Sequence, residues 1–467
     1  SIVVLPFDNL SPDPGDAYFS DGLTEEIITN LSYLRSLRVI SRSTAMVLKG
    51  SRKDVRTIGR ELNVRYVLEG SVRKVGEGLR VTAQLIDTRT DEHLWVDRLD
   101  GTMADVFAVQ ERIARSIVDA LEVEVSPREE WRITRKPITD PHVYDTWLRA
   151  IHACHTLTAP AVDRAMRLVE GALETVGPNS LLYGTLGYLQ WALYDMGIQH
   201  EEAVLDRGEE HAKKALELDP SLPQGWFAKG LIRYKRGDMG GWIRDGRRAA
   251  DLGGHGEVFS FLAFSLGEVG WMEEAQRYAD EGLSRDPLDF PPQFMAASVD
   301  LFVGDTGSAF RRLRKARDRF APGEPFSGWW LCQMAAYDGR EAEARAVARE
   351  VTGLDGGLFS DLCRLQEHAL EGDHEGVLET LASSNLREVA STDEYFPICL
   401  ANNLTLVGEE DEALDWIGRA IKWGFTNHVF LSEHDRLLVP LRDSRRFVSL
   451  MELAHRRQEE ILDEVRA

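Results

Sequence analysis

The hydrophobic pattern changes character near residue 125. Before that point, residues 66–73 and 79–85 alternate apolar and polar side chains with a period of two, which predicts β-strands. VGEG at 75–78 lies between them and predicts a hairpin turn. Short apolar runs predict further strands at 1–7, 37–41 and 93–98. Apolar residues at helical spacing predict helices over 18–34, 54–64 and 106–121.

The predicted order of elements is β-α-β-α-β-β-β-α, which is typical of an α+β layer sandwich. Asp21 is placed to cap the first helix, and Asp54 is placed to cap the second. We therefore predict an α+β domain over residues 1–125.

After residue 125 the helical pattern repeats with a period near 34. Five residues end successive helical stretches at steps of 34, 33, 35 and 34: Pro220, Gly254, Pro287, Pro322 and Gly356. Such a period predicts a stacked helix-turn-helix array of the tetratricopeptide kind, an all-α solenoid. An insertion near 193–202 and a degenerate repeat at 358–390 interrupt the period.

These patterns predict four regions. They are an α+β domain at 1–125, a polar linker at 126–141, a tetratricopeptide-repeat array of seven or eight repeats at 142–440, and a capping helix at 441–467. The last helix carries a charged face (Arg456, Arg457, Glu459, Glu460), which suits an end cap because the last repeat has no neighbour.

Several segments of the first 120 residues carry a family resemblance. VLPF, DGLTEEI and YVLEGSVR together resemble the TolB-like amino-terminal domain of bacterial signalling proteins. The resemblance implies that this domain is joined to tetratricopeptide repeats and to an upstream serine/threonine kinase, class III adenylate cyclase or winged-helix regulator. It implies no catalytic residues.

Composition restricts the function further. The chain has 467 residues, 43% apolar and 28% charged, with a net charge of −22. Residues 1–125 hold 16 basic against 20 acidic residues, and the remainder holds 39 against 57. A chain this acidic repels phosphate backbones, and we therefore expect no nucleic-acid binding by this region. We expect membrane attachment only through a segment outside these residues, because no apolar run has the length of a membrane span and the chain reads as part of a longer protein.

The candidate chemical groups do not assemble into a catalytic set. His152, Cys154 and His155 share a helix but lack a third strong local ligand, and His428, His434 and Asp435 have the same shortage. No phosphate-binding glycine loop and no Ser-His-Asp arrangement is present in the sequence. The four cysteines lack CxxC spacing and are expected as small buried residues. We expect no catalytic residues, no cofactor and no metal in this region.

A partner surface is expected on the concave face of the array. In tetratricopeptide repeats the first helix of each pair lines that face. The positions predicted to contact a partner are Phe227, Leu231, Tyr234, Lys235, Tyr395, Ile398, Asn402 and Thr405. The Lys and Asn residues of a carboxylate clamp are mostly absent from them, so an apolar or mixed peptide groove is favoured.

The sequence therefore predicts a non-catalytic sensor or scaffold region of a bacterial signalling protein that binds a protein or peptide. Two alternatives stay open. The region regulates an enzyme whose catalytic domain precedes Ser1, in the order kinase, adenylate cyclase, transcription regulator; or it is a self-assembly module that forms homo-oligomers. The compartment stays open between the cytoplasm and the outside of a single-span membrane protein.

Overall fold

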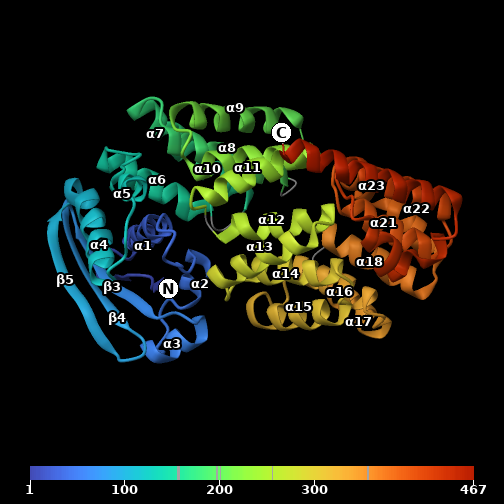
Figure 1. Ribbon diagram of the computed structural model, residues 1–467, viewed down its shortest axis with the longest axis horizontal. Coiled ribbons are helices and arrows are strands. Elements are labelled where there is room, and N and C mark those ends of the chain that lie inside the picture. The colour runs from blue at the N-terminus through green and yellow to red at the C-terminus, as the bar shows by residue number, and fades with distance from the viewer. Residues whose placement is uncertain (155–157, 196–197, 200, 255, 355–356, 467) are drawn as a thin grey trace. The chain divides into compact units, whose positions relative to one another are not determined.

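The computed structural model describes residues 1–154, 158–195, 198–199, 201–254, 256–354 and 357–466 (Figure 1). The contacts divide the chain into two compact units. Unit 1 holds Ser1–Ile232, Asp245–Val258 and Ser284–Leu288; unit 2 holds Arg233–Arg244, Phe259–Leu283 and Asp289–Ala467.

Unit 1 begins with a twisted mixed sheet. The strand order is β1-β3-β4-β5, with β2 also paired to β3. The strands are β1 (Ile2–Val4), β2 (Asp8–Asn9), β3 (Tyr66–Val75), β4 (Gly78–Asp87) and β5 (Glu92–Thr102). β1 runs parallel to β3, whereas β3, β4 and β5 are antiparallel neighbours. The hairpin predicted at 75–78 joins β3 to β4, and Gly76 takes the positive φ of 56° that this tight turn requires.

Helices complete this domain. They are α1 (Ala17–Ser32), α2 (Arg42–Val47), α3 (Val55–Leu62) and α4 (Val106–Ala120). α1 and α4 pack together and contact β1, β4 and β5, so helices and sheet form layers. The inward alternation of β4, with Val81, Ala83 and Leu85 almost fully buried, forms the sheet side of the core.

Two local predictions for this domain are wrong. The apolar run at 37–41 forms only an isolated bridge between Val39 and Ile2, because the chain turns immediately into α2. Asp21 does not cap α1, which already begins at Ala17; it lies one turn inside the helix and pairs with Lys49 at 2.5 Å. Asp54 does cap α3, accepting the Thr57 backbone N–H at 2.9 Å.

Helix pairs make up most of the remaining chain. The first helices of the pairs are α6 (Pro141–Cys154), α8 (Ser180–Asp195), α10 (Pro223–Lys235), α12 (Gly256–Val269), α14 (Phe290–Phe302), α16 (Pro325–Tyr337), α18 (Leu358–Glu371) and α21 (Phe396–Leu406). The second helices are α7 (Ala159–Val176), α9 (Glu202–Leu218), α11 (Met239–Asp251), α13 (Met272–Arg285), α15 (Thr306–Phe320), α17 (Glu341–Thr352), α19 (His374–Ser383) and α22 (Glu410–Trp423). A short α20 (Leu386–Ala390), turns η3 (Phe430–His434) and η4 (Arg436–Leu441), and α23 (Arg445–Arg466) complete the chain.

The periodic end markers have a simple structural meaning. Pro220, Gly254, Pro287 and Pro322 each follow the end of a second helix, at Leu218, Asp251, Arg285 and Phe320 respectively. Proline and glycine stop a helix there because one lacks a backbone donor and the other tolerates unusual dihedrals. Gly356 lies outside the described residues. A small sheet region followed by a long all-helical region is the fold class that the sequence predicts.

The first helix pair packs directly against the sheet region. The Tyr18 hydroxyl donates to Asp145 Oδ1 at 2.6 Å, and Lys74 Nζ lies 3.1 Å from the same oxygen. The Arg149 guanidinium stacks 4.6 Å from the centre of the Tyr18 ring. A Cβ on Gly22 of α1 would lie only 2.6 Å from a Leu148 methyl, so the two helices are in close contact.

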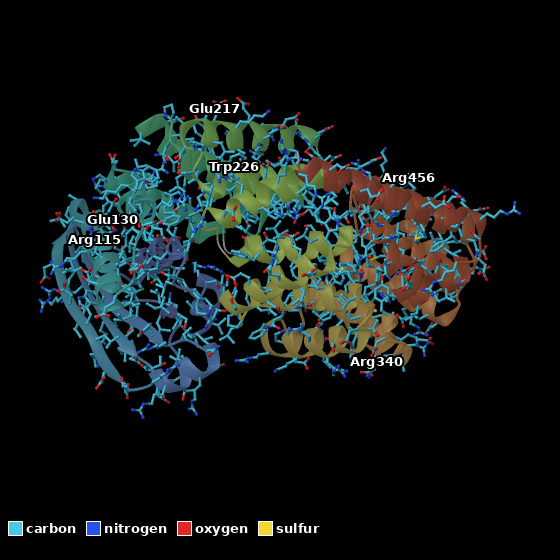
Figure 2. The ribbon with its side chains drawn as sticks, in the orientation of Figure 1. Arg115, Glu130, Glu217, Trp226, Arg340 and Arg456 are labelled. Carbon is cyan, nitrogen blue, oxygen red and sulfur yellow. The ribbon has the colours of Figure 1, made fainter. Side chains whose placement is uncertain are left out.

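The segment predicted as a linker contains helix α5 (Pro127–Thr134), which opens with a capping box between Ser126 and Glu129. Glu130 of α5 pairs with Arg115 of α4 at 2.7 Å (Figure 2). Unit 1 therefore extends well beyond residue 125, and the four-region division stays a prediction based on element type.

Unit 2 has one continuous hydrophobic core. Its members come from α12 and from α14 through α23. They include an aromatic cluster in which Phe302 contacts the rings of Phe264, Tyr395, Phe425 and Phe430. No helix among the described residues is both long and apolar enough to cross a bilayer.

Candidate functional site

The eight predicted partner-contacting positions lie mostly inside the protein. The seven positions other than Lys235 are each at most 7% exposed, and the Lys235 side chain is 12% exposed. Phe227 packs in unit 1 with its ring 6.3 Å from that of Tyr188, and Leu231 is fully buried. The structure therefore assigns these residues first to packing, and their contact with a partner stays a prediction.

The structure brings several of the other predicted positions together inside unit 2. Tyr234 and Lys235 end α10, and Tyr395 immediately precedes α21, about 160 residues later in the chain. Between them lies a group that we call the acidic cluster: Tyr234, Lys235, Glu268, Asp393 and Glu394. The sequence offered no signal for Glu268, Asp393 or Glu394, because their neighbours are distant in the chain.

The acidic cluster joins three helices. The Tyr234 hydroxyl donates to Glu268 Oε2 of α12 at 2.8 Å, and Lys235 Nζ lies 3.4 Å from Asp393 Oδ2. Asp393 also starts α21, since its Oδ1 accepts the backbone N–H groups of Tyr395 and Phe396, both at 2.9 Å. Its two carboxylate oxygens thus hold α10 and α21 in one arrangement.

Burial and mutual repulsion raise the pKa values of two carboxyl groups in this cluster, those of Glu268 and Glu394. Glu268 is fully buried and Glu394 is 5% exposed, and each has one carboxylate oxygen without a hydrogen-bond partner among the described residues. Burial, followed by the charge of Glu394, raises the pKa of Glu268 well above its usual value. Burial, followed by the charge of Asp393, raises the pKa of Glu394 to about 7. The pair therefore keeps a proton near neutral pH.

A second buried polar group lies beside the cluster. The Asn402 amide donates to the Tyr337 hydroxyl at 2.7 Å, and that hydroxyl is 3.4 Å from the hydroxyl of Tyr395. Burial raises the pKa of Asp435 to about 7, although its Oδ1 accepts the backbone N–H of Leu437 at 3.0 Å. Asn402 is thus a structural hydrogen-bond donor.

The segment after α22 closes the end of α12. A helix leaves its last carbonyl groups without helical partners. Here the backbone N–H groups of Thr426 and Asn427 donate to the Glu268 carbonyl at 2.9 and 2.8 Å, and the Asn427 side chain donates to the Gly267 carbonyl at 2.8 Å. Gln458 of α23 donates to the Val269 carbonyl at 2.5 Å. This long-range cap positions Glu268 within the acidic cluster.

Within the described residues no three His, Cys, Asp or Glu side chains are arranged to bind a metal. His155 lies outside those residues, and His428 stacks on His455 with ring centres 4.9 Å apart. A surface depression of about 210 Å³ is lined by Arg387, Glu412, Asp415, Trp416 and Arg419. Arg387 and Glu412 are already paired there through two hydrogen bonds of 3.0 and 3.1 Å.

Comparisons with known sequences find bacterial proteins that are similar to parts of this chain. Residues 1–116 match the family model described as HilA/YgeH-like transcriptional regulator, second domain. Over 234 residues, half of this chain is 40% identical to "Putative adenylate cyclase 3" of Rhizobium meliloti, covering 40% of that protein. "Transcriptional regulator HilA" of Salmonella typhimurium is 23% identical over 48% of this chain and 42% of its own length. The chain thus spans about two fifths of the length of these relatives, and the TolB-like resemblance stays a prediction.

Comparisons with solved structures concern the fold alone. The crystal structure of Rap protein complexed with competence and sporulation factor aligns with 69% of this chain and 99% of its own, at a TM-score of 0.50 and 11% identity. YrrB, a "TPR protein with an unusual peptide-binding site", aligns over 46% of this chain and 97% of its own, with a TM-score of 0.30 and 16% identity. The human IFIT1 dimer with PPP-AAAA aligns over 68% of this chain and 78% of its own, with a TM-score of 0.41 and 14% identity. The small sheet region followed by a long series of helix pairs confirms the predicted fold class, and the Rap alignment agrees with it.

Proposed function

We propose that this region is the non-catalytic sensor and scaffold part of a bacterial signalling protein, which binds a protein or peptide and regulates a separate output domain. The observation that supports this most is the long helix-pair array, whose buried polar groups serve caps and packing. The matches to a regulator domain and to repeat proteins also indicate a non-catalytic region.

The output domain that we favour is an adenylate cyclase, followed by a transcription regulator. The 40% identity to a protein named as an adenylate cyclase supports the first choice, and the match to HilA supports the second. A kinase, which was the first choice from the sequence alone, takes third place because neither of these two relatives carries that name. Sequencing the gene upstream of Ser1 distinguishes the three.

The partner class is tested with the purified chain. Cross-linking mass spectrometry in extracts of the native cell, followed by binding of the purified candidate, should find a protein or peptide whose cross-links fall on the helix pairs at 142–440. If no such partner binds while a small metabolite raises the melting temperature, the protein-binding function is wrong.

The exclusion of nucleic acid from the partners stays a prediction, because a neighbour of related fold, IFIT1, was solved with PPP-AAAA. Retention of the chain by single-stranded RNA or duplex DNA at physiological salt would contradict it. The net charge of −22 predicts no such retention.

A further inference from the structure

The outer edge of β5 is an open strand edge. β5 is paired to β4 on one side, and among the residues that the structure describes no strand pairs with its other side, as Figure 1 shows. The backbone N–H of Arg98 donates to the adjacent Asp97 side chain at 2.8 Å, and that of Thr102 donates to Asp105 at 2.7 Å. Neither amide belongs to the ladder with β4. Because backbone groups alternate along a strand, the even-numbered residues of this stretch direct their N–H and C=O groups outward.

The regular part of this edge is short and well defined. The pairing with β4 is interrupted between Leu85 and Ile86, opposite His93 and Trp95, so an irregularity ends the regular ladder there. From Val96 to Thr102 the register with β4 is continuous. This seven-residue stretch contains no proline or lysine, the residues that usually block an edge. Val96 leaves 57% of its surface exposed.

The stretch is complementary to itself. If a second copy runs antiparallel to it with Leu99 opposite Leu99, Arg98 of each copy lies opposite Asp100 of the other. Both residues direct their backbone groups outward, so this pair exchanges two N–H···O bonds once the Arg98 N–H leaves the Asp97 carboxylate. On the opposite side of the sheet, Leu99 meets Leu99 of the second copy.

Other registers are disfavoured by charge. A copy centred one residue earlier opposes Arg98 to itself, and a copy centred one residue later opposes Asp100 to itself. A copy centred on Asp97 places the two Asp97 carboxylates opposite each other, on the face of the sheet where Leu99 is buried. Like charges directly opposite each other destabilise strand pairing, whereas opposite charges stabilise it. Both side chains are exposed, Arg98 by 57% and Asp100 by 54%. Asp100 pairs with Arg98 at 3.2 Å and also with Arg80 of β4.

We propose that two copies of this chain associate through antiparallel pairing of residues 96–102 of β5, which joins their sheets into one continuous sheet across a two-fold axis at Leu99. The occupant of the edge is thus a second copy of the chain. This inference is independent of the proposed function.

The test measures the dimer dissociation constant of the full 467-residue chain by sedimentation across a dilution series. Arg98→Glu places the new carboxylate opposite Asp100 of the other copy at both symmetry-related contacts. The two negative charges repel, so the dissociation constant should rise about tenfold or more. Because Arg80 of β4 pairs with Asp100, the rescue variant also changes that residue: Arg98→Glu, Asp100→Arg, Arg80→Glu restores opposite charges within and between copies and should recover dimerisation. Arg73→Glu is the matched control, because it makes the same charge change on β3, away from the edge.

Hydrogen exchange provides a second readout that does not rely on variants. The outward amides of Val96, Arg98 and Asp100 should exchange more slowly as protein concentration rises. A chain that is monomeric at every concentration overturns the proposal. So does a dimer that Arg98→Glu leaves as tight as the original, or one whose β5 amides exchange at the same rate as in the monomer.

Discussion

At the residue scale, the buried polar side chains of the array serve to hold helices together. Glu268 and Glu394 are buried carboxylates near one another, and their neighbours include Tyr234 and Lys235. Burying charge costs free energy unless it is compensated. The cluster reduces that cost by retaining protons, which makes it a device for holding helices together and a source of pH-dependent stability.

The variant Glu394→Gln should reveal that pH dependence. The pKa of Glu394 is raised from 4.5 to about 7 in the folded chain, so its stabilising protonated form is complete below pH 4.5 and is lost as pH rises through 7. The free energy of unfolding of the original chain should therefore fall over this range. The variant should lose this part of the slope and gain about 1–3 kcal/mol at pH 8.

Chemical denaturation at a series of pH values measures this effect. Glu273→Gln on the exposed surface of α13 is the control and should leave the slope unchanged. Identical slopes for Glu394→Gln and the original chain would show that Glu394 titrates normally.

The variant Gly70→Ala should destabilise the sheet. A Cβ at this position of β3 would lie 2.2 Å from the Thr82 backbone carbonyl and 2.9 Å from the Phe7 ring. Because the carbonyl belongs to the neighbouring strand, it cannot move without breaking the ladder, and we expect a loss of about 2–3 kcal/mol. Gly171→Ala, in α7 with no atom within 4 Å of the added carbon, should be neutral or stabilising by up to about 1 kcal/mol. Equal melting temperatures for the two variants would contradict the close approach at Gly70.

At the element scale, the sequence predicted what local pattern controls. The hairpin at 75–78, the cap at Asp54 and the helix ends before Pro220, Pro287 and Pro322 depend on neighbouring residues, and the structure confirms them. The sequence pattern could not predict that residues 426–427 cap α12 or that Asp393 pairs with Lys235, because these partners are more than 150 residues apart. The strand expected at 37–41 failed because tertiary contacts, not propensity, decide whether a short apolar run joins a sheet.

The cap on α12 can be tested with Asn427→Ala. This change removes the 2.8 Å donor to the Gly267 carbonyl and the 3.0 Å acceptor for the backbone N–H of Phe430, both buried. Leaving buried partners unsatisfied should cost about 1–3 kcal/mol. Asn385→Ala, at an exposed position whose side chain makes no capping bond, should change the unfolding free energy by less than about 0.5 kcal/mol. Thermal or urea unfolding measures the free energy of unfolding of both variants. Equal losses for Asn427→Ala and Asn385→Ala would contradict the cap.

At the scale of the whole molecule, unit 1 joins elements that the sequence separates. The segment 284–288, which includes the periodic marker Pro287, docks on the start of α2: Asp286 Oδ1 accepts from the Thr44 backbone N–H at 3.0 Å and from its hydroxyl at 2.6 Å. Thr44 in turn accepts the backbone N–H of Leu288 at 2.9 Å. The sheet region is therefore a built-in part of a larger compact unit.

The variant Asp286→Ala should loosen that unit. It leaves the buried Thr44 hydroxyl without this acceptor and the Thr44 backbone N–H with only Ser41 Oγ at 3.4 Å, so we expect a loss of about 1–3 kcal/mol and faster hydrogen exchange in α2. Asp280→Ala on the exposed face of α13 is the matched control and should leave the exchange of α2 unchanged. Unchanged exchange in α2 of the Asp286 variant would show that the segment does not hold α2.

The most direct test of the central claim measures the output of the intact native protein with and without residues 142–467, expressed to equal levels. Cyclic AMP formation is the first readout, and occupancy of promoter DNA is the second. A regulatory, non-catalytic array predicts that its deletion changes the output severalfold while the output domain stays folded and active. Output that is the same in both proteins would contradict regulation, and loss of all chemistry from a folded output domain would contradict the non-catalytic assignment.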